Sequence, residues 1–147
     1  MYQCILVATD ASALGRKAEQ AAIGLAASTG ASLVAVHVVP DYPLSLFEGR
    51  DSMPPEEVAR IEDEGCSRGQ AVVDGVVEAA GALGVAARGV LARSDHVADA
   101  VLAAARKHGC DLIVMASHGH RGVRRMLLGS ETQKVLTHSA IPVLVLR

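Results

Sequence analysis

Apolar residues along this chain fall into short continuous runs separated by longer stretches of helical periodicity. The continuous runs, typical of strands, lie at residues 3–8, 32–39, 85–91, 111–116 and 142–146. The periodic stretches, typical of helices, lie at residues 13–29, 56–83, 94–107 and 130–139. Because nearly all the runs are apolar throughout rather than on alternate residues, their strands should be buried on both faces of a parallel sheet. The pattern therefore predicts a single α/β domain over residues 1–147, a doubly wound five-stranded parallel sheet with helices on both faces. For such a sheet we expect the strand order 3-2-1-4-5.

Polar and turn-forming residues mark where these elements begin and end. Asp10 and Ser12 can both accept hydrogen bonds from backbone amides at the start of the first helix, and Gly30 suits its C-cap. Ser94 is expected to begin the third helix. Residues 40–55 contain four of the five prolines and are predicted to form a long irregular connection, a kind of segment that is often functional.

Composition narrows the class of protein. Half of the residues are hydrophobic but only 2% are aromatic, so the core must be aliphatic. A formal net charge of −2 argues against nucleic-acid binding through bulk electrostatics. No apolar run approaches the ~18 residues that a membrane span needs, and we expect no targeting segment. Three dispersed cysteines without a CxxC pair indicate a reducing cytoplasm, with Cys4 and Cys110 interpreted as small apolar core residues.

A glycine-rich segment follows the fourth predicted strand. In MASHGHRGVRRMLLGSETQ, residues 115–133, Gly119 and Gly122 would let the backbone approach a ligand, and Gly129-Ser130 opens the last helix. The amides and dipole of a helix start attract phosphate, and the Ser130 hydroxyl can add a hydrogen bond. The segment lacks the lysine of a P-loop, and a dinucleotide fingerprint would follow the first strand instead. On these residues alone, an ordinary turn and helix start is equally open.

The chain resembles the universal stress protein family over essentially its whole length, and the matching features are CILVATDAS, SLVAVHVV, DLIVMASHGHRG and LLGSETQKVLTHSAIPVLVL. The resemblance implies a homodimeric cytoplasmic α/β protein and, in one branch of the family, ATP binding through Gly-x2-Gly-x9-Gly-Ser/Thr. Gly119, Gly129 and Ser130 match this motif, whereas Ala116 stands at its first glycine. An added methyl group at a strand end is harmless where φ is negative, so we expect ATP binding to be retained, if weakened.

The resemblance also implies roles for individual residues. Asp10 and Val38 would contact adenine, Asp10 by accepting a hydrogen bond from the exocyclic amine and Val38 through its backbone and as an apolar wall. Asp10 would serve equally as the N-cap of the first helix. Arg121 would reach the outer phosphates, although a solvated loop arginine is an equal alternative. Glu131, in the first turn of the last helix, would repel a triphosphate unless it points away or Mg²⁺ intervenes, so the expected cofactor is ATP, with or without Mg²⁺.

Three functions are compatible with these features. Our hypothesis is a nucleotide-responsive stress protein, in which ATP orders the 40–55 connection or the dimer. The alternative is a dimeric adaptor that binds no nucleotide. An enzyme is not expected, because no Ser/His/Asp order, acid pair or catalytic lysine stands out. No metal site is expected either, since His118 and His120 lack a third ligand at a familiar spacing. The apolar run at 142–146 is an expected edge strand through which two copies would pair.

Overall fold

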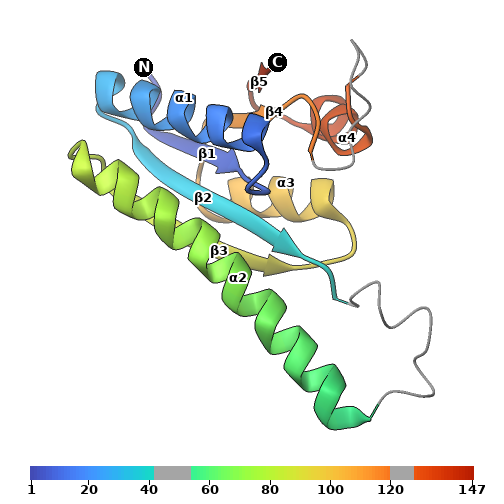
Figure 1. Cartoon of the computed structure of the whole chain (residues 1–147). Coiled ribbons are helices and arrows are strands. Elements are labelled where there is room, and N and C mark those ends of the chain that lie inside the picture. The colour runs from blue at the N-terminus through green and yellow to red at the C-terminus, as the bar shows by residue number, and fades with distance from the viewer. Residues whose placement is uncertain (42–53, 120–127) are drawn as a thin grey trace.

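The computed structural model describes residues 1–41, 54–119 and 128–147, along which strands and helices alternate (Figure 1). The strands are β1 Cys4–Ala8, β2 Ser32–Val39, β3 Ala87–Arg93, β4 Leu112–Ala116 and β5 Val143–Leu146. The helices are α1 Ala13–Thr29, α2 Pro55–Ala82, α3 Val97–Lys107 and α4 Ser130–His138. Neighbouring strands are parallel in the order β3-β2-β1-β4-β5, which confirms the predicted α/β fold and strand order.

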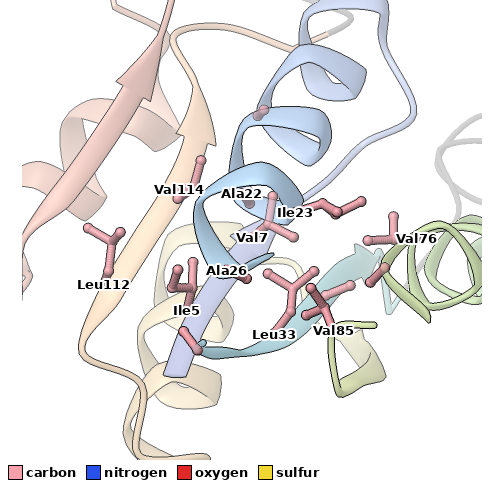
Figure 2. Close-up of a cluster of buried hydrophobic side chains, with 14 residues drawn as sticks. Ile5, Val7, Ala22, Ile23, Ala26, Leu33, Val76, Val85, Leu112 and Val114 are labelled. Carbon is pink, nitrogen blue, oxygen red and sulfur yellow. The ribbon is translucent and has the colours of Figure 1, made fainter. Parts of the chain in front are cut away.

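Helices cover both faces of this sheet. On one face, α1 and α2 pack on alternate side chains of the central strands (Figure 2). The small side chains of Ala22 and Ala26 let α1 approach Ile5 and Val7 of β1, and all four residues are buried. On the other face, α3 and α4 pack over a second cluster that contains Leu6. The central strands are therefore buried from both sides, as their continuous apolar runs predict.

The first helix begins and ends at residues that the sequence indicates. Ser12 is the N-cap, and its hydroxyl accepts a hydrogen bond from the Gly15 amide at 2.9 Å. Asp10 accepts instead from the Ser12 amide at 3.0 Å, so it braces the turn before the helix and is not the N-cap. Gly30 ends α1 with a left-handed φ of 74°, a conformation that glycine adopts at little cost.

The third helix begins at Val97 rather than at Ser94, where the sequence places it. The Ser94 hydroxyl accepts a hydrogen bond from the His96 amide at 3.0 Å and so forms a turn ahead of the helix. His96 is the N-cap but makes no side-chain capping bond. Instead, the Ala98 amide donates to the Glu131 carboxylate of α4 at 2.8 Å. This cap comes from a distant residue, which local sequence does not reveal.

The third strand lies at Ala87–Arg93, so both of its ends are shifted two residues toward the C-terminus from the predicted range 85–91. Val85 is apolar and buried, but its amide closes the end of α2 by donating to the Ala80 carbonyl at 3.0 Å. Gly84, with φ 75°, makes this return of the chain possible. Val85 therefore fills the core from a turn, and strand pairing begins after it.

The longest helix, α2, is continuous over 28 residues although several glycines lower its helix propensity. One of them, Gly69, has a packing role, since a β-carbon there would come within 2.6 Å of Leu91 Cδ1 and 2.9 Å of His37 Cδ2. Gly69 therefore lets α2 lie close against β2 and β3. Neither α2 nor any other helix in the described part of the chain is long and apolar enough to cross a membrane.

Candidate functional site

A cavity of about 670 Å³ opens at the edge of the sheet where β1, β2 and β4 end. Its volume lies in the range of small-molecule sites, roughly 300–1,000 Å³. Its walls come from these strand ends, from the loops that follow them, and from the starts of α3 and α4. Segments that are far apart in the sequence therefore converge on one hollow.

The strand order explains why the cavity lies here. β1 and β4 are neighbours, yet β1 is followed in the chain by β2 on one side and β4 by β5 on the other. The connections that leave β1 and β4 therefore diverge, and a crevice opens between them beyond the carboxyl ends of the strands. The predicted ligand site requires this adjacency of the first and fourth strands, and the structure provides it.

Most of the predicted site residues line this one cavity: Asp10, Val38, Ala116, Gly119, Gly129, Ser130 and Glu131. Arg121 and Gly122, also predicted, lie outside the described residues, as does most of the 40–55 connection. The structure thus brings together the adenine-side and phosphate-side candidates.

One wall of the cavity is apolar. It is formed by Val36 and Val38 of β2, Met115 of β4, and Val97 and Val101 of α3. Sequence reasoning found only Val38, because the others resemble ordinary core positions. Strand alternation could have found Val36, which lies two residues earlier on the same face. This wall suits a flat, weakly polar part of a ligand.

The Asp10 carboxylate lies between two glycines at the edge of the cavity. Its Oδ1 atom accepts the hydrogen bond from Ser12, and a β-carbon at Gly15 would come within 2.5 Å of the same oxygen. A β-carbon at Gly119 would collide with Oδ2. The sequence analysis predicts that Gly119 lets a ligand approach the backbone. In the structure, the absence of a side chain at Gly119 also leaves space for the Asp10 carboxylate.

Hydrogen bonds on both sides hold the turn that carries Asp10. Thr9 Oγ1 donates to Glu19 of α1, and the Thr9 carbonyl lies 2.8 Å from Nδ1 of His37. A carbonyl can only accept, so this His37 nitrogen carries a proton. Ala11 has φ 63°, a left-handed conformation that costs a residue with a β-carbon about 1 kcal/mol. The surrounding bonds hold this strained turn and so position the Asp10 backbone.

The opposite side of the cavity is the N-terminus of α4. Gly129 is the N-cap, and its carbonyl accepts the first helical hydrogen bond from Gln133 at 3.0 Å. The Gly129 amide donates to Ser117 O at 2.7 Å, and a β-carbon at Gly129 would lie only 3.3 Å from that oxygen. The amides of the first turn, beginning with Ser130, have no partner within the helix, and the helix dipole adds positive potential. This end of the cavity suits an anionic group.

Ala116 does not obstruct the cavity through its backbone conformation. It is the last residue of β4, its φ is negative, and its carbonyl accepts a hydrogen bond from Thr132 Oγ1 at 2.9 Å. Strand alternation places Ala116 on the same side as Val114, which packs with α1, whereas Met115 faces α3 and the apolar wall. Its methyl group is therefore directed away from the α3 side of the cavity.

The Glu131 carboxylate is turned toward α3. Its Oε2 atom accepts the hydrogen bond from Ala98 at the start of α3, and Oε1 lies 3.4 Å from Lys134 Nζ. Both partners offset its negative charge. The predicted repulsion of an anion at the α4 N-terminus is reduced by this arrangement, although Glu131 still lines the cavity.

No group of three His, Cys, Asp or Glu side chains within residues 1–41, 54–119 and 128–147 is arranged to hold a metal ion. His118 lines the cavity with its Nδ1 atom 3.2 Å from Ser117 Oγ, and His120 lies outside the described residues. The described part of the cavity therefore offers an apolar wall, two carboxylates and a helix N-terminus. It fits a ligand with a flat ring that carries a hydrogen-bond donor at one end and an anionic group at the other.

Known proteins resemble this chain in sequence and in fold. The profile of the Universal stress protein family matches residues 1–147. Universal stress protein YxiE of Bacillus subtilis is 33% identical over 149 aligned positions, which cover all of both chains. The solved structure of universal stress protein UspA from Lactobacillus plantarum is similar with a TM-score of 0.82 at 22% identity, over 99% of this chain and 98% of that one.

Two further solved structures contain nucleotides. A universal stress protein in complex with cAMP has a TM-score of 0.71 at 24% identity, over 99% of this chain and 97% of that one. The universal stress protein from Archaeoglobus fulgidus in complex with dAMP has a TM-score of 0.62 at 20% identity, over 99% and 98%. At these identities the likeness establishes the shared fold.

Proposed function

This chain belongs to the universal stress protein family, and we propose that it binds an adenine nucleotide, ATP, in the cavity at the ends of β1, β2 and β4. The observation that carries the proposal is that the α4 N-terminus, Asp10 and the apolar wall all face one cavity. Two structural neighbours bind cAMP and dAMP, which share an adenine ring and a phosphate. We propose that the protein acts in the stress response as a nucleotide-responsive regulator.

The proposed orientation follows from the chemistry of the two ends. The adenine ring lies against Val38 and Met115, and its exocyclic amine donates to the Asp10 carboxylate. The phosphates lie at the start of α4, where the amides from Ser130 onward donate to them. Ala116 lies between these ends, beside the ribose.

Glu131 bears on the choice of nucleotide. A triphosphate brings more negative charge to the α4 N-terminus than a monophosphate does, and the Glu131 carboxylate stands in the first turn. Its bonds to Ala98 and Lys134 lower the repulsion, and Mg²⁺ would lower it further by offsetting the negative charge of the phosphates. We therefore expect Mg²⁺ to strengthen ATP binding more than AMP binding.

Calorimetry on protein freed of carried-over nucleotide tests the proposal. ATP, AMP and cAMP are titrated with and without Mg²⁺ into wild-type protein, Gly129→Val and Gly75→Val. Valine at residue 129 would press on Ser117 O and shift the start of α4, so we expect affinity to fall at least about tenfold. Gly75 of α2 has open space around it and is the matched control, with unchanged affinity expected.

The outcomes separate nucleotide binding from the adaptor function. Unchanged affinity in a folded Gly129→Val variant would show that the α4 N-terminus does not bind the phosphates. No heat with any of the three nucleotides at hundreds of micromolar would refute the proposal. In that case the alternative, a dimeric adaptor that binds no nucleotide, would be favoured.

We further propose that nucleotide is bound without efficient hydrolysis. The described lining of the cavity contains no lysine or arginine that could stabilise the charge on a transferring phosphate. Phosphate release from Mg·ATP should therefore stay at the level of a protein-free control. Release well above that level would make the protein an enzyme.

The homodimer is proposed through β5. This strand is at the edge of the sheet, and Leu144 on it and Leu136 on α4 are each 41% exposed. An apolar edge strand without charges inside it tends to pair with another strand, and two copies can pair about a two-fold axis. The three unbonded cysteines are typical of the reducing cytoplasm, where we propose that the dimer acts.

Light scattering after size-exclusion chromatography tests the dimer at micromolar concentration. Wild-type protein should have the mass of two chains, and Leu144→Lys should shift it toward one, because a charge at the edge opposes pairing. Leu83→Lys is the matched control, since Leu83 is 62% exposed at the end of α2 and should not affect mass. A wild-type monomer would contradict the proposal.

A further inference from the structure

Two cysteines that are 106 residues apart in the sequence meet at the opposite end of the sheet from the cavity. Cys4 is the first residue of β1, and Cys110 lies just before β4. Their sulfur atoms are 3.2 Å apart. The sequence interpretation of these residues as separate apolar fillers misses this contact, because it arises only from the pairing of β1 with β4.

The backbone around the two thiols is held in place. The Asp111 carboxylate accepts hydrogen bonds from the Gln3 amide at 2.9 Å and the Cys4 amide at 3.2 Å. The Asp111 amide donates in turn to the Cys4 carbonyl at 2.9 Å. These bonds join the residue after Cys110 to Cys4 itself. The sulfurs need to approach by only about 1.1 Å to reach the disulfide length of about 2.05 Å.

The two thiols differ in their surroundings. Cys110 is 7% exposed, and burial, together with the hydrogen bond to Cys4, raises the pKa of its thiol to about 12. Cys110 therefore stays protonated and can donate its S–H to the Cys4 sulfur. Cys4 is partly exposed and also lies 3.8 Å from the His108 carbonyl. An oxidant in solution can reach Cys4 before Cys110.

We propose that Cys4 and Cys110 form a redox-active pair that hydrogen peroxide, or another hydroperoxide, converts to an intramolecular disulfide. The Cys4 sulfur, as thiolate, attacks one peroxide oxygen, the O–O bond breaks, and the leaving hydroxide takes up a proton to become water. This leaves a sulfenic acid on Cys4. The Cys110 sulfur then attacks the Cys4 sulfur, the S–O bond breaks, and the departing hydroxide leaves as water with the Cys110 proton. Two thiols are oxidised to one disulfide, and the peroxide is reduced to two waters.

The disulfide would tie β1 to the connection between α3 and β4. Both strands run from this point to the cavity, so the modification bears on the same central strands without touching the lining residues. The proposal does not depend on nucleotide binding, since it concerns residues at the other edge of the sheet. The third cysteine, Cys66, lies on α2 and has no part in it.

Mass spectrometry of the full chain tests the proposal. The Cys66→Ser variant, which keeps only the proposed pair, is reduced, freed of reductant, treated with hydrogen peroxide, unfolded and alkylated with iodoacetamide. We expect the chain to lose the mass of two hydrogen atoms, to take up no alkyl group, and to yield a Cys4–Cys110 linked peptide that dithiothreitol separates. Wild-type protein should give the same linked peptide, with Cys66 alkylated.

Three results would overturn the proposal. One is uptake of two alkyl groups after peroxide treatment, and another is addition of oxygen atoms to Cys4 without a link. The third is a link between two chains or to Cys66. Cys4→Ser/Cys66→Ser should show no link and one alkylated thiol at Cys110. The wild-type peptide map decides the question even if a variant fails to fold.

Discussion

Replacing Gly119 by alanine would place a methyl group against the Asp10 carboxylate. Gly119 does not have a left-handed φ, so its backbone conformation is accessible to alanine, and the obstacle is the collision with Asp10 Oδ2. Asp10 has little room to move away. Its other oxygen accepts the hydrogen bond from Ser12, and Gly15 closes the space on that side.

The size of the effect can be worked out from these contacts. Moving the carboxylate sacrifices a hydrogen bond to a charged group, worth about 1.5–3 kcal/mol, and we take the lower part of this range because Asp10 is only half-buried. Forcing the side chain off its rotamer adds about 0.5–1.5 kcal/mol. Against these losses, alanine stabilises the folded state by about 0.4–1 kcal/mol, because it lowers the conformational entropy of the unfolded chain. The expected net loss is about 1–3 kcal/mol in the free energy of unfolding, or roughly 3–10 °C in Tm for a chain of this size.

Urea unfolding followed by far-ultraviolet circular dichroism measures this loss, since the chain has no tryptophan for fluorescence. The decisive comparison is a double-mutant cycle of Gly119→Ala with Asp10→Ala. Once the carboxylate is gone, the methyl group has nothing to displace, and Gly119→Ala should be neutral or slightly stabilising. The coupling energy should therefore be about 2 kcal/mol.

Two results would refute this reasoning. One is an equal loss from Gly119→Ala with and without Asp10, which would mean that the methyl group disturbs something other than the carboxylate. The other is a gain of stability in the wild-type background. Gly75→Ala is the control, because its surroundings are open and alanine there should stabilise α2 by about 1 kcal/mol.

Three further predictions concern packing, capping and titration, each measured by urea unfolding. Gly69→Ala should cost about 1–3 kcal/mol, because its methyl group would overpack against β2 and β3, whereas a gain like that of Gly75→Ala would contradict the close contact. Glu131→Ala should cost about 0.5–2 kcal/mol by uncapping α3, with Lys134→Ala as a near-neutral control; equal effects would argue against the cap. Stability should fall between about pH 9 and 12, because the folded pKa of Cys110 is raised to about 12 and the unfolded chain releases this proton earlier. Cys110→Ala should remove that part of the decline, and an unchanged pH dependence would contradict it.

The sequence by itself determined the fold and several of the positions that line the cavity, among them Asp10, Gly129 and Ser130. Continuous apolar runs specify strands buried on both faces, and that property depends on side-chain type alone. The start and end of α1 followed from Ser12 and Gly30, whose bonding partners lie within a few residues. The glycine-rich segment after the fourth strand indicated the start of α4 for the same local reason.

Tertiary structure decided what depends on pairs of residues that are distant in the chain. The start of α3 depends on Glu131 of α4, whose carboxylate accepts a hydrogen bond from the Ala98 amide. The position of β3 depends on Val85, whose amide bonds to the end of α2 while its side chain fills the core. Gly119 makes room for Asp10, a contact that exists only because β1 and β4 are neighbours. The same pairing brings Cys4 beside Cys110. Periodicity and local signals report on neighbours within a turn or a strand, whereas these contacts depend on the three-dimensional packing of elements that are far apart in sequence.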